Sequence, residues 1–180
     1  VISKGQNGRR AEFPRYDFSK KDLMTVNLSM ADLSYCRLKN INLSRAHLIM
    51  ADLQHADLRG ADLSYSDLRG ARLSRANLSS ANLTGARLSP VPMHGTIGQN
   101  WPTNLDSARL TNAQMRGADL TGANCIGARF NGAVMNECKF DKTNFSDADL
   151  EDAELGGSDL STANLRGAHG VETETDDEAK

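Results

Sequence analysis

The residues that could perform catalytic or metal chemistry are scattered along this 180-residue chain. The four histidines are dispersed: His47, His55, His94 and His169. The cysteines lack the short paired spacing of a zinc site. Serines and aspartates recur at one fixed interval, as turn residues do, and form no Ser–His–Asp set; phosphate-loop and calcium-loop patterns are also missing. The sequence therefore predicts a non-enzymatic protein without a metal, a cofactor or a small-molecule substrate.

The three cysteines occupy positions that the sequence pattern assigns to the interior. They are Cys36, Cys125 and Cys138. A buried free thiol behaves as a small apolar side chain, and we expect that role for all three. Free cysteines suit a reducing compartment, which favours a cytoplasmic location.

A period of five residues organises the chain. It is clearest over 51–70, which reads ADLQH-ADLRG-ADLSY-SDLRG. A leucine at every fifth position forms no stripe on a helix and changes face at each repeat of a flat strand. The pattern therefore requires a backbone that turns a corner every five residues.

The leucine position, which we name the centre of each block, recurs in two registers. The first runs from Phe13 to Leu88 and the second from Leu105 to Leu165. Of these 29 centres, 26 are Leu or Phe, and alanine stands two residues before the centre in 19 blocks. In an extended segment these two positions point to the same side, so we expect both to point inward. We name the alanine position the small site.

This pattern resembles the pentapeptide-repeat family, whose consensus is A-(D/N)-L-x-x, over residues 11–167. The resemblance implies an all-β fold: a right-handed quadrilateral β-helix of about seven coils with four blocks in each, interrupted by one loop. Glycines at the ends of several blocks, such as Gly60 and Gly70, fit corners that need positive φ. The core would include these leucines: Leu33, Leu53, Leu58, Leu63, Leu68, Leu120 and Leu150.

Segments without the five-residue period lie before, between and after the two runs of repeats. We expect residues 1–10 to form a flexible lead-in. Tyr16 and Lys21 are too large for the interior, so we expect them to cover the N-terminal end of the rod as a cap. The repeats occupy 11–90 and 103–167, with a proline-rich loop at 89–102 between them. The loop is either a clean insertion of 12 residues, or Val91–Met93 is a degenerate block and the insertion is nearer seven.

Both ends of the chain also carry predictions. The tail 168–180 is acidic, and this composition predicts that it is disordered. It offers no capping helix, so the last coil is open, which favours end-to-end pairing with a second copy through the C-terminal coil, or continuation in a longer chain. The start at Val1 is that of a trimmed chain or a fragment.

Charge and hydropathy limit the classes of partner. No apolar run approaches the length of a membrane span. Residues 1–88 carry 14 Lys/Arg and 8 Asp/Glu, a net +6, and the remainder carries 7 and 15, a net −8. Direct binding of DNA through the basic half is disfavoured because its arginines alternate with aspartates.

Three groups of outward residues are candidate partner-binding sites. The first is in the loop: Met93, His94 and Trp101. The second is a stack of residues 20 apart: Tyr35, His55 and Arg75. The third is apolar: Met30, Ile49 and Met50. Trp101 either folds back to hold the loop against the coils or belongs to a recognition tip. A further column of asparagines, beginning at Asn104, predicts a hydrogen-bonded ladder.

Two functions remain open. The first is a rigid scaffold that binds an unidentified protein partner. The second comes from the resemblance: some pentapeptide-repeat proteins, including those conferring quinolone resistance, mimic duplex DNA and bind DNA gyrase or topoisomerase IV. The net basic first half has the wrong sign for such a mimic, so the interaction scaffold is the leading interpretation and topoisomerase binding the alternative.

Overall fold

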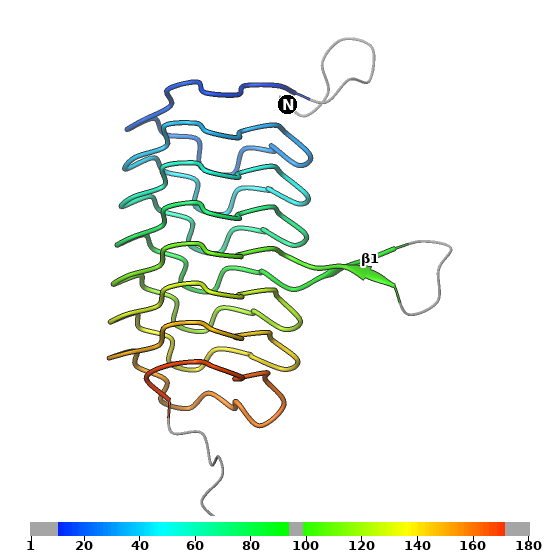
Figure 1. Ribbon diagram of the computed structural model, residues 1–180. Coiled ribbons are helices and arrows are strands. Elements are labelled where there is room, and N and C mark those ends of the chain that lie inside the picture. Colours follow the sequence, from blue (N-terminus) through cyan, green and yellow to red (C-terminus); the bar gives the residue numbers. More distant parts are fainter. Residues whose placement is uncertain (1–10, 94–98, 172–180) are drawn as a thin grey trace, which may run out of the picture.

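The chain forms a right-handed β-helix shaped as a four-sided rod, in a computed structural model that describes residues 11–93 and 99–171 (Figure 1). Away from the loop, parallel bridges join the second residue of a block to the residue 20 positions later, as in Asp32 to Asp52 and Asp52 to Arg72. One turn of the helix therefore holds four five-residue blocks. We number the sides from Phe13, so the first side holds Leu53 and the fourth holds Leu68, and each corner takes the number of the side before it.

Hydrogen bonds explain why each block needs five residues. In the block 51–55, the Asp52 N–H donates to the Ala31 carbonyl of the preceding coil at 2.9 Å, and the Leu53 N–H donates to the Arg72 carbonyl of the next at 2.7 Å. The Leu53 carbonyl then accepts the Ala56 N–H at 3.1 Å, which closes the corner. The last two residues of the block form the turn, and the His55 N–H adds a further bond to the next coil by donating to the Ser74 carbonyl at 3.1 Å.

The aspartate or asparagine before each centre has a turn-forming role. The Asp52 Oδ1 atom accepts the backbone N–H of Gln54 at 3.1 Å, and Asn77 and Asn104 make the same bond to the residue two positions later. Without this acceptor the N–H at the corner would have no partner in the ladder. Local chemistry therefore accounts for the second position of the repeat.

Almost every block ends in the left-handed region of φ. His55 has φ of 58°, Tyr65 of 56° and Gly70 of 66°, and 18 described non-glycine residues have positive φ. Corners therefore adopt this conformation whether or not they carry glycine. The repeated ladder bonds must outweigh a cost of about 1–2 kcal/mol at each such non-glycine residue.

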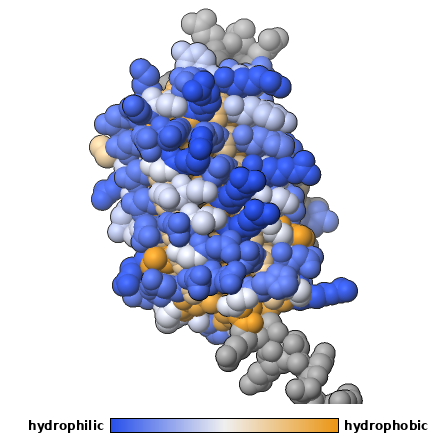
Figure 2. Space-filling model, turned by 60° about the vertical axis from the view of Figure 1, so that its left-hand side comes forward, coloured by the Kyte–Doolittle hydropathy of each residue, from blue (hydrophilic) through white to orange (hydrophobic). Residues whose placement is uncertain are grey.

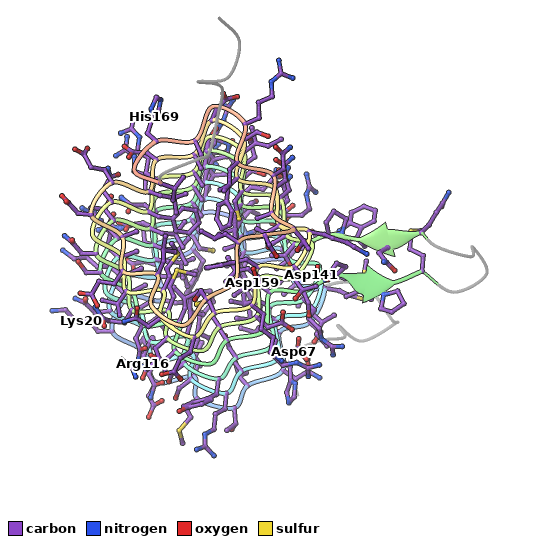
Figure 3. The ribbon with its side chains drawn as sticks, turned by 90° about the horizontal axis from the view of Figure 1, so that it is seen from below. Lys20, Asp67, Arg116, Asp141, Asp159 and His169 are labelled. Atoms are coloured by element: carbon purple, nitrogen blue, oxygen red, sulfur yellow. The ribbon has the colours of Figure 1, made fainter. Side chains whose placement is uncertain are left out.

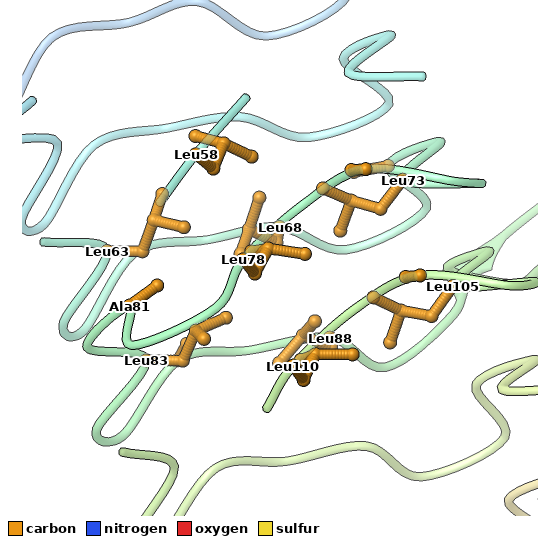
Figure 4. Packing of buried hydrophobic residues seen from close by; sticks show 14 of the residues in the cluster. Leu58, Leu63, Leu68, Leu73, Leu78, Ala81, Leu83, Leu88, Leu105 and Leu110 are labelled. Carbon is orange, nitrogen blue, oxygen red and sulfur yellow. The ribbon is translucent and has the colours of Figure 1, made fainter. Parts of the chain in front are cut away.

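The interior contains stacked leucines and alanines (Figure 4). All seven leucines predicted for the core are fully buried: Leu33, Leu53, Leu58, Leu63, Leu68, Leu120 and Leu150. Among the described residues, every centre from Leu28 to Leu150 is at most 4% exposed. Apolar area removed from water in this column is the main stabilising contribution to the fold.

The loop is a clean 12-residue insertion. Arg72 pairs with Asn104, 32 residues later, and the three other bridges that span the loop have the same separation, whereas bridges elsewhere join residues 20 apart. Leu105 consequently stacks below Leu73 (Figure 4). The alternative of a degenerate block at 91–93 is wrong, because strand β1 (Val91–Pro92) pairs antiparallel with β2 (Asn100–Trp101) and projects from the fourth corner as a hairpin (Figure 1).

Thr103 closes the gap from which the hairpin leaves. Its buried hydroxyl accepts the N–H of Gly70 at 2.9 Å and donates to the Leu68 carbonyl at 3.2 Å. The β-helix thereby continues below the insertion in the same register.

Replacing Thr103 with valine should lower the free energy of unfolding by about 1–3 kcal/mol, because the buried Gly70 N–H loses its acceptor. Thr143→Val is the matched control: the Thr143 hydroxyl is also buried but only donates, to the Leu120 carbonyl. Urea unfolding followed by circular dichroism would compare the two. An equal loss in both variants would contradict the role assigned to Thr103.

The two ends of the rod differ. At the N-terminal end the ring of Tyr16 lies 4.6 Å from that of Phe18, and Lys21 is exposed. At the C-terminal end Leu155, Leu160 and Leu165 are only half-buried, and hydrophobic surface gathers there (Figure 2). End-to-end pairing through this surface stays a prediction that sedimentation equilibrium would check.

The last coil continues past the predicted boundary at residue 167. Ala168 packs against the core and His169 pairs with Asp149. The first residues assigned to the acidic tail therefore belong to the β-helix, because they continue its ladder. The rest of that tail and the lead-in 1–10 lie outside the described residues.

Candidate partner-binding surface

An apolar ridge runs down the fourth corner into the hairpin. Met30, Met50 and Gly70 occupy this corner in successive coils. A Cβ atom at Gly70 would lie 3.0 Å from Val91 Cγ2, 3.2 Å from Trp101 Cδ1 and 3.3 Å from Met50 Cγ. Two groups predicted separately, the methionines and the loop tryptophan, thus meet at one glycine. We name this surface the hairpin ridge: Met30, Met50, Val91, Met93 and Trp101.

The ridge is open to solvent at several points. Met30 is 57% exposed, Met93 44% and Trp101 41%, while Ile49 is half-buried beside Met50. The indole of Trp101 therefore packs on the coils and stays partly exposed, and its role in recognition stays a prediction. His94 lies outside the described residues.

A groove of about 210 Å³ lies beside Trp101. Its lining residues are Arg72, Trp101, Pro102, Asn104 and Asn124. The groove combines an aromatic ring and a proline with a guanidinium group and two carboxamides. The Asn124 Nδ2 atom donates to Asn104 Oδ1 at 3.2 Å, which confirms this contact of the predicted asparagine ladder and orients both amides.

Arginines surround two buried carboxylates at the foot of the hairpin. Asp67, only 8% exposed, accepts two bonds of 2.8 Å from Arg69, and Arg87 lies 3.3 Å away (Figure 3 labels Asp67 beside the hairpin). Asp52 pairs with Arg72 at 3.0 Å. Burial alone would raise the pKa of Asp67, but the hydrogen bonds and charges of Arg69, with that of Arg87, outweigh it and lower the pKa.

Because the Asp67 pKa is lower folded than unfolded, its contribution to stability is complete above the unfolded pKa of about 3.9. The contribution is lost as the pH falls through the folded pKa. We therefore expect the melting temperature to fall steeply below about pH 4, and Asp67→Asn to flatten part of that fall. Thermal melts between pH 7 and pH 2.5 would measure the difference. Parallel profiles for the two proteins would rule out Asp67 as a source of the pH dependence.

The predicted stack at the first corner forms but stays separate from the hairpin ridge. The rings of Tyr35 and His55 lie parallel, with centroids 4.6 Å apart, and the Arg15 guanidinium sits 5.1 Å from the Tyr35 centroid. Arg75 occupies the same corner in the next coil. This column contains mutually supporting contacts, and its role in partner binding stays a prediction.

Sequence reasoning missed a second aromatic column at the third corner. Arg45 lies 5.9 Å from the ring of Tyr65, which is 60% exposed and covers Gly85. The 20-residue spacing of Arg45, Tyr65 and Gly85 was the available signal. Because Gly85, the third residue of this column, has no side chain, the ring of Tyr65 has room to lie over it.

A second hollow opens between the last two coils. Its volume is about 460 Å³ and its lining includes Lys139, Asp141 and Asp159. The Ser158 hydroxyl is inserted there, accepting the Cys138 N–H at 2.9 Å and donating to the Met135 carbonyl at 2.8 Å. The hollow combines both signs of charge without a specific ligand geometry.

The cysteines are buried as predicted. Cys36 and Cys125 are fully buried and Cys138 is 4% exposed. Burial raises the pKa of the Cys138 thiol to about 11, and also raises those of the other two. Within residues 11–93 and 99–171, no three His, Cys, Asp or Glu side chains are grouped to hold a metal ion. The same residues contain no helix long and apolar enough to cross a bilayer.

Comparisons with known proteins agree with this geometry. Eight copies of the pentapeptide repeats match over residues 27–64, 56–89, 103–136 and 128–167, more than half of the chain. A comparison with curated proteins found no significant match.

Two solved structures are similar to this chain. Full-length QnrB1, a plasmid-mediated fluoroquinolone resistance protein, is 21% identical with a TM-score of 0.55, and the match covers 88% of each chain. HetL, involved in heterocyst differentiation regulation in the cyanobacterium Nostoc sp. strain PCC 7120, is 28% identical with a TM-score of 0.42, covering 88% of this chain and 84% of HetL. The repeat matches, together with the 20-residue turn, show that the chain belongs to the pentapeptide-repeat family.

Proposed function

We propose that this protein is a non-enzymatic rigid scaffold that binds a protein partner through the hairpin ridge. The supporting observation is the meeting of Met50, Val91 and Trp101 over Gly70, which joins the hairpin to the methionine column. Outside the ridge, the exposed large hydrophobic residues in the described part of the chain are Tyr16, Met24, Tyr35 and Tyr65.

The composition of the ridge fits a protein interface. Tryptophan, methionine and arginine are enriched at interface centres, and Trp101 is bordered by Arg72. Packing of the indole against Gly70 reduces the side-chain entropy that binding would otherwise cost. The surrounding coils hold the ridge in place, as loops on rigid scaffolds are held in many binding proteins.

The structure permits a hairpin deletion that keeps the repeat register. Removing residues 91–102 joins Pro90 to Thr103 and leaves unbroken five-residue blocks, because the insertion has 12 residues. Pro90 would then end an ordinary block, where φ is positive, so Pro90→Gly completes the design. The matched control is Tyr35→Ser with His55→Ser, which removes an exposed stack at another corner.

The test is chemical crosslinking and quantitative mass spectrometry in the source cells. We expect the hairpin deletion to lose a partner that the intact protein and the control retain, with unchanged circular dichroism. Equal capture by the deletion variant would contradict the proposal. Loss of that partner only in the control would assign binding to the Tyr35 column instead.

Binding to a topoisomerase as a DNA mimic is the alternative function. QnrB1 is a fluoroquinolone resistance protein, but at 21% identity the likeness concerns the fold alone. The acidic residues of the last coils favour the idea: Asp147, Asp149, Glu151, Asp152, Glu154 and Asp159. They surround the end of the rod, however, whereas a phosphate-like pattern needs lines of charge along it.

A gyrase supercoiling assay with and without a fluoroquinolone tests the alternative. Inhibition by this protein, or rescue from the drug, at micromolar concentration would establish it. Unchanged supercoiling in both conditions would eliminate it and leave the interaction scaffold.

A further inference from the structure

At the foot of the hairpin the arginine side chains are exposed to solvent, and the aspartate side chains that they pair with are largely buried. The Arg72 side chain is 46% exposed above Asp52, whose side chain is 10% exposed. The Arg87 side chain is 54% exposed above Asp67, at 11%. Arg69, at 27%, also covers Asp67.

This arrangement leaves a net positive spot on a net negative protein. The three arginines and two aspartates sum to +1, while the whole chain carries −2. Because the carboxylates lie underneath, the groups that an approaching molecule meets first are guanidinium N–H donors. Arg72 is on the side after the corner, and Arg69 and Arg87 are on the side before it.

Arg72 also lines the groove beside Trp101. The lining of the groove combines two apolar residues, Trp101 and Pro102, with three polar ones: Arg72, Asn104 and Asn124. Only the Arg72 Nη1 atom is bonded to Asp52, which leaves further guanidinium donors for an added acceptor. A volume of about 210 Å³ suits one large side chain with a neighbouring carboxylate.

We propose that the partner of the hairpin ridge is an acidic protein segment that carries a large apolar residue beside an aspartate or glutamate. The apolar side chain lies in the groove against Trp101 and Pro102, and the carboxylate binds the outer donors of Arg72. This inference rests on the proposed function and adds the chemistry of the partner.

A nucleic acid fits this surface less well. Phosphate backbones bind through several cations at once, and affinity grows with their number. Here Arg72 is the one cationic side chain that lines the groove, so a phosphate backbone would lack the several cations it needs. A carboxylate flanked by an apolar group can contact both the polar and the apolar residues that line the groove, whereas a phosphate contacts only the polar ones.

The test is selection of 12-residue peptides from a random display library on the intact protein. We expect enriched peptides to contain acidic residues next to Trp, Phe or Leu. Their affinity should fall about 30-fold in Trp101→Ala and about 10-fold in Arg72→Gln, with most of the second loss restored in Arg72→Lys. Arg109→Gln, an exposed arginine on the second side, should bind normally.

Folding is checked separately, because Trp101 packs on Gly70. Each variant must keep the circular dichroism and the melting temperature of the intact protein within a few degrees; Arg72→Gln, which lies outside the hairpin, provides the second readout if Trp101→Ala fails this check. The absence of any enriched peptide, enrichment of peptides lacking acidic residues, or equal binding by Arg72→Gln would overturn the inference.

A 20-nucleotide poly(dT) strand is the competing probe. Binding of this strand that requires Arg72 and Trp101, without acidic-peptide binding, would replace the acidic segment with a nucleic acid. If peptide selection fails while the hairpin deletion still loses its cellular partner, the proposed function stands and only the acidic chemistry is wrong.

Discussion

Leu63→Lys should unfold the protein or lower its free energy of unfolding by about 4 kcal/mol or more. Leu63 is fully buried, and Leu83 of the next coil lies below it (Figure 4). An ammonium group at this position would have no carboxylate partner and no route to water, because buried leucine and alanine side chains fill the interior around it. Urea titration followed by circular dichroism measures the change.

Ser64→Lys provides the control for Leu63→Lys. Ser64 is the next residue, and its side chain points out of the coil and is partly exposed. We expect a change within about 0.5 kcal/mol, as for ordinary surface substitutions. A stable Leu63→Lys protein would refute the inward assignment of the centre position.

Gly70→Val should destabilise the protein by about 2–5 kcal/mol and displace the hairpin. Part of the cost is conformational, because φ of 66° disfavours a side chain by about 1–2 kcal/mol. The rest, about 1–3 kcal/mol, comes from crowding, because Val91, Trp101 and Met50 already occupy the space above the Cα atom.

Gly117→Val separates the two costs. Gly117 has the same φ of 66°, and no atom lies within 4 Å of an added Cβ. The difference between the variants, measured by urea unfolding, is therefore the packing contribution of the hairpin. Tryptophan fluorescence of the single Trp101 should shift to the red only in Gly70→Val. Equal destabilisation with unchanged fluorescence would show that the hairpin does not rest on Gly70.

The five-residue period was enough to predict the core from sequence, and the resemblance to the pentapeptide-repeat family supplied the fold. Leu63 and its equivalents are identified by periodicity alone, because burial in a repeat follows from position within the block. The column containing Tyr35 and His55 was also predictable, since residues 20 apart must stack once the turn holds four blocks.

Other features depended on contacts that a repeat pattern does not contain. The packing of Trp101 on Gly70 is made by a loop residue outside the period, so its position could not follow from spacing. Asp67 occupies an outward position, and its burial results from two arginine side chains folding over it. Thr103 looks like an ordinary small-site residue in the sequence, and its role appears only when the hairpin interrupts the ladder.

The direction of the ladder bonds has a mechanical consequence. Bonds such as Leu53 N–H to Arg72 carbonyl join one coil to the next, so they lie along the length of the rod. A pulling force along that length would load them coil by coil, and the terminal coils would peel away first. A force across the rod would instead be carried by the covalent chain that surrounds each coil. We therefore expect the protein to be mechanically anisotropic: weak when pulled by its ends and stiff when squeezed from its sides.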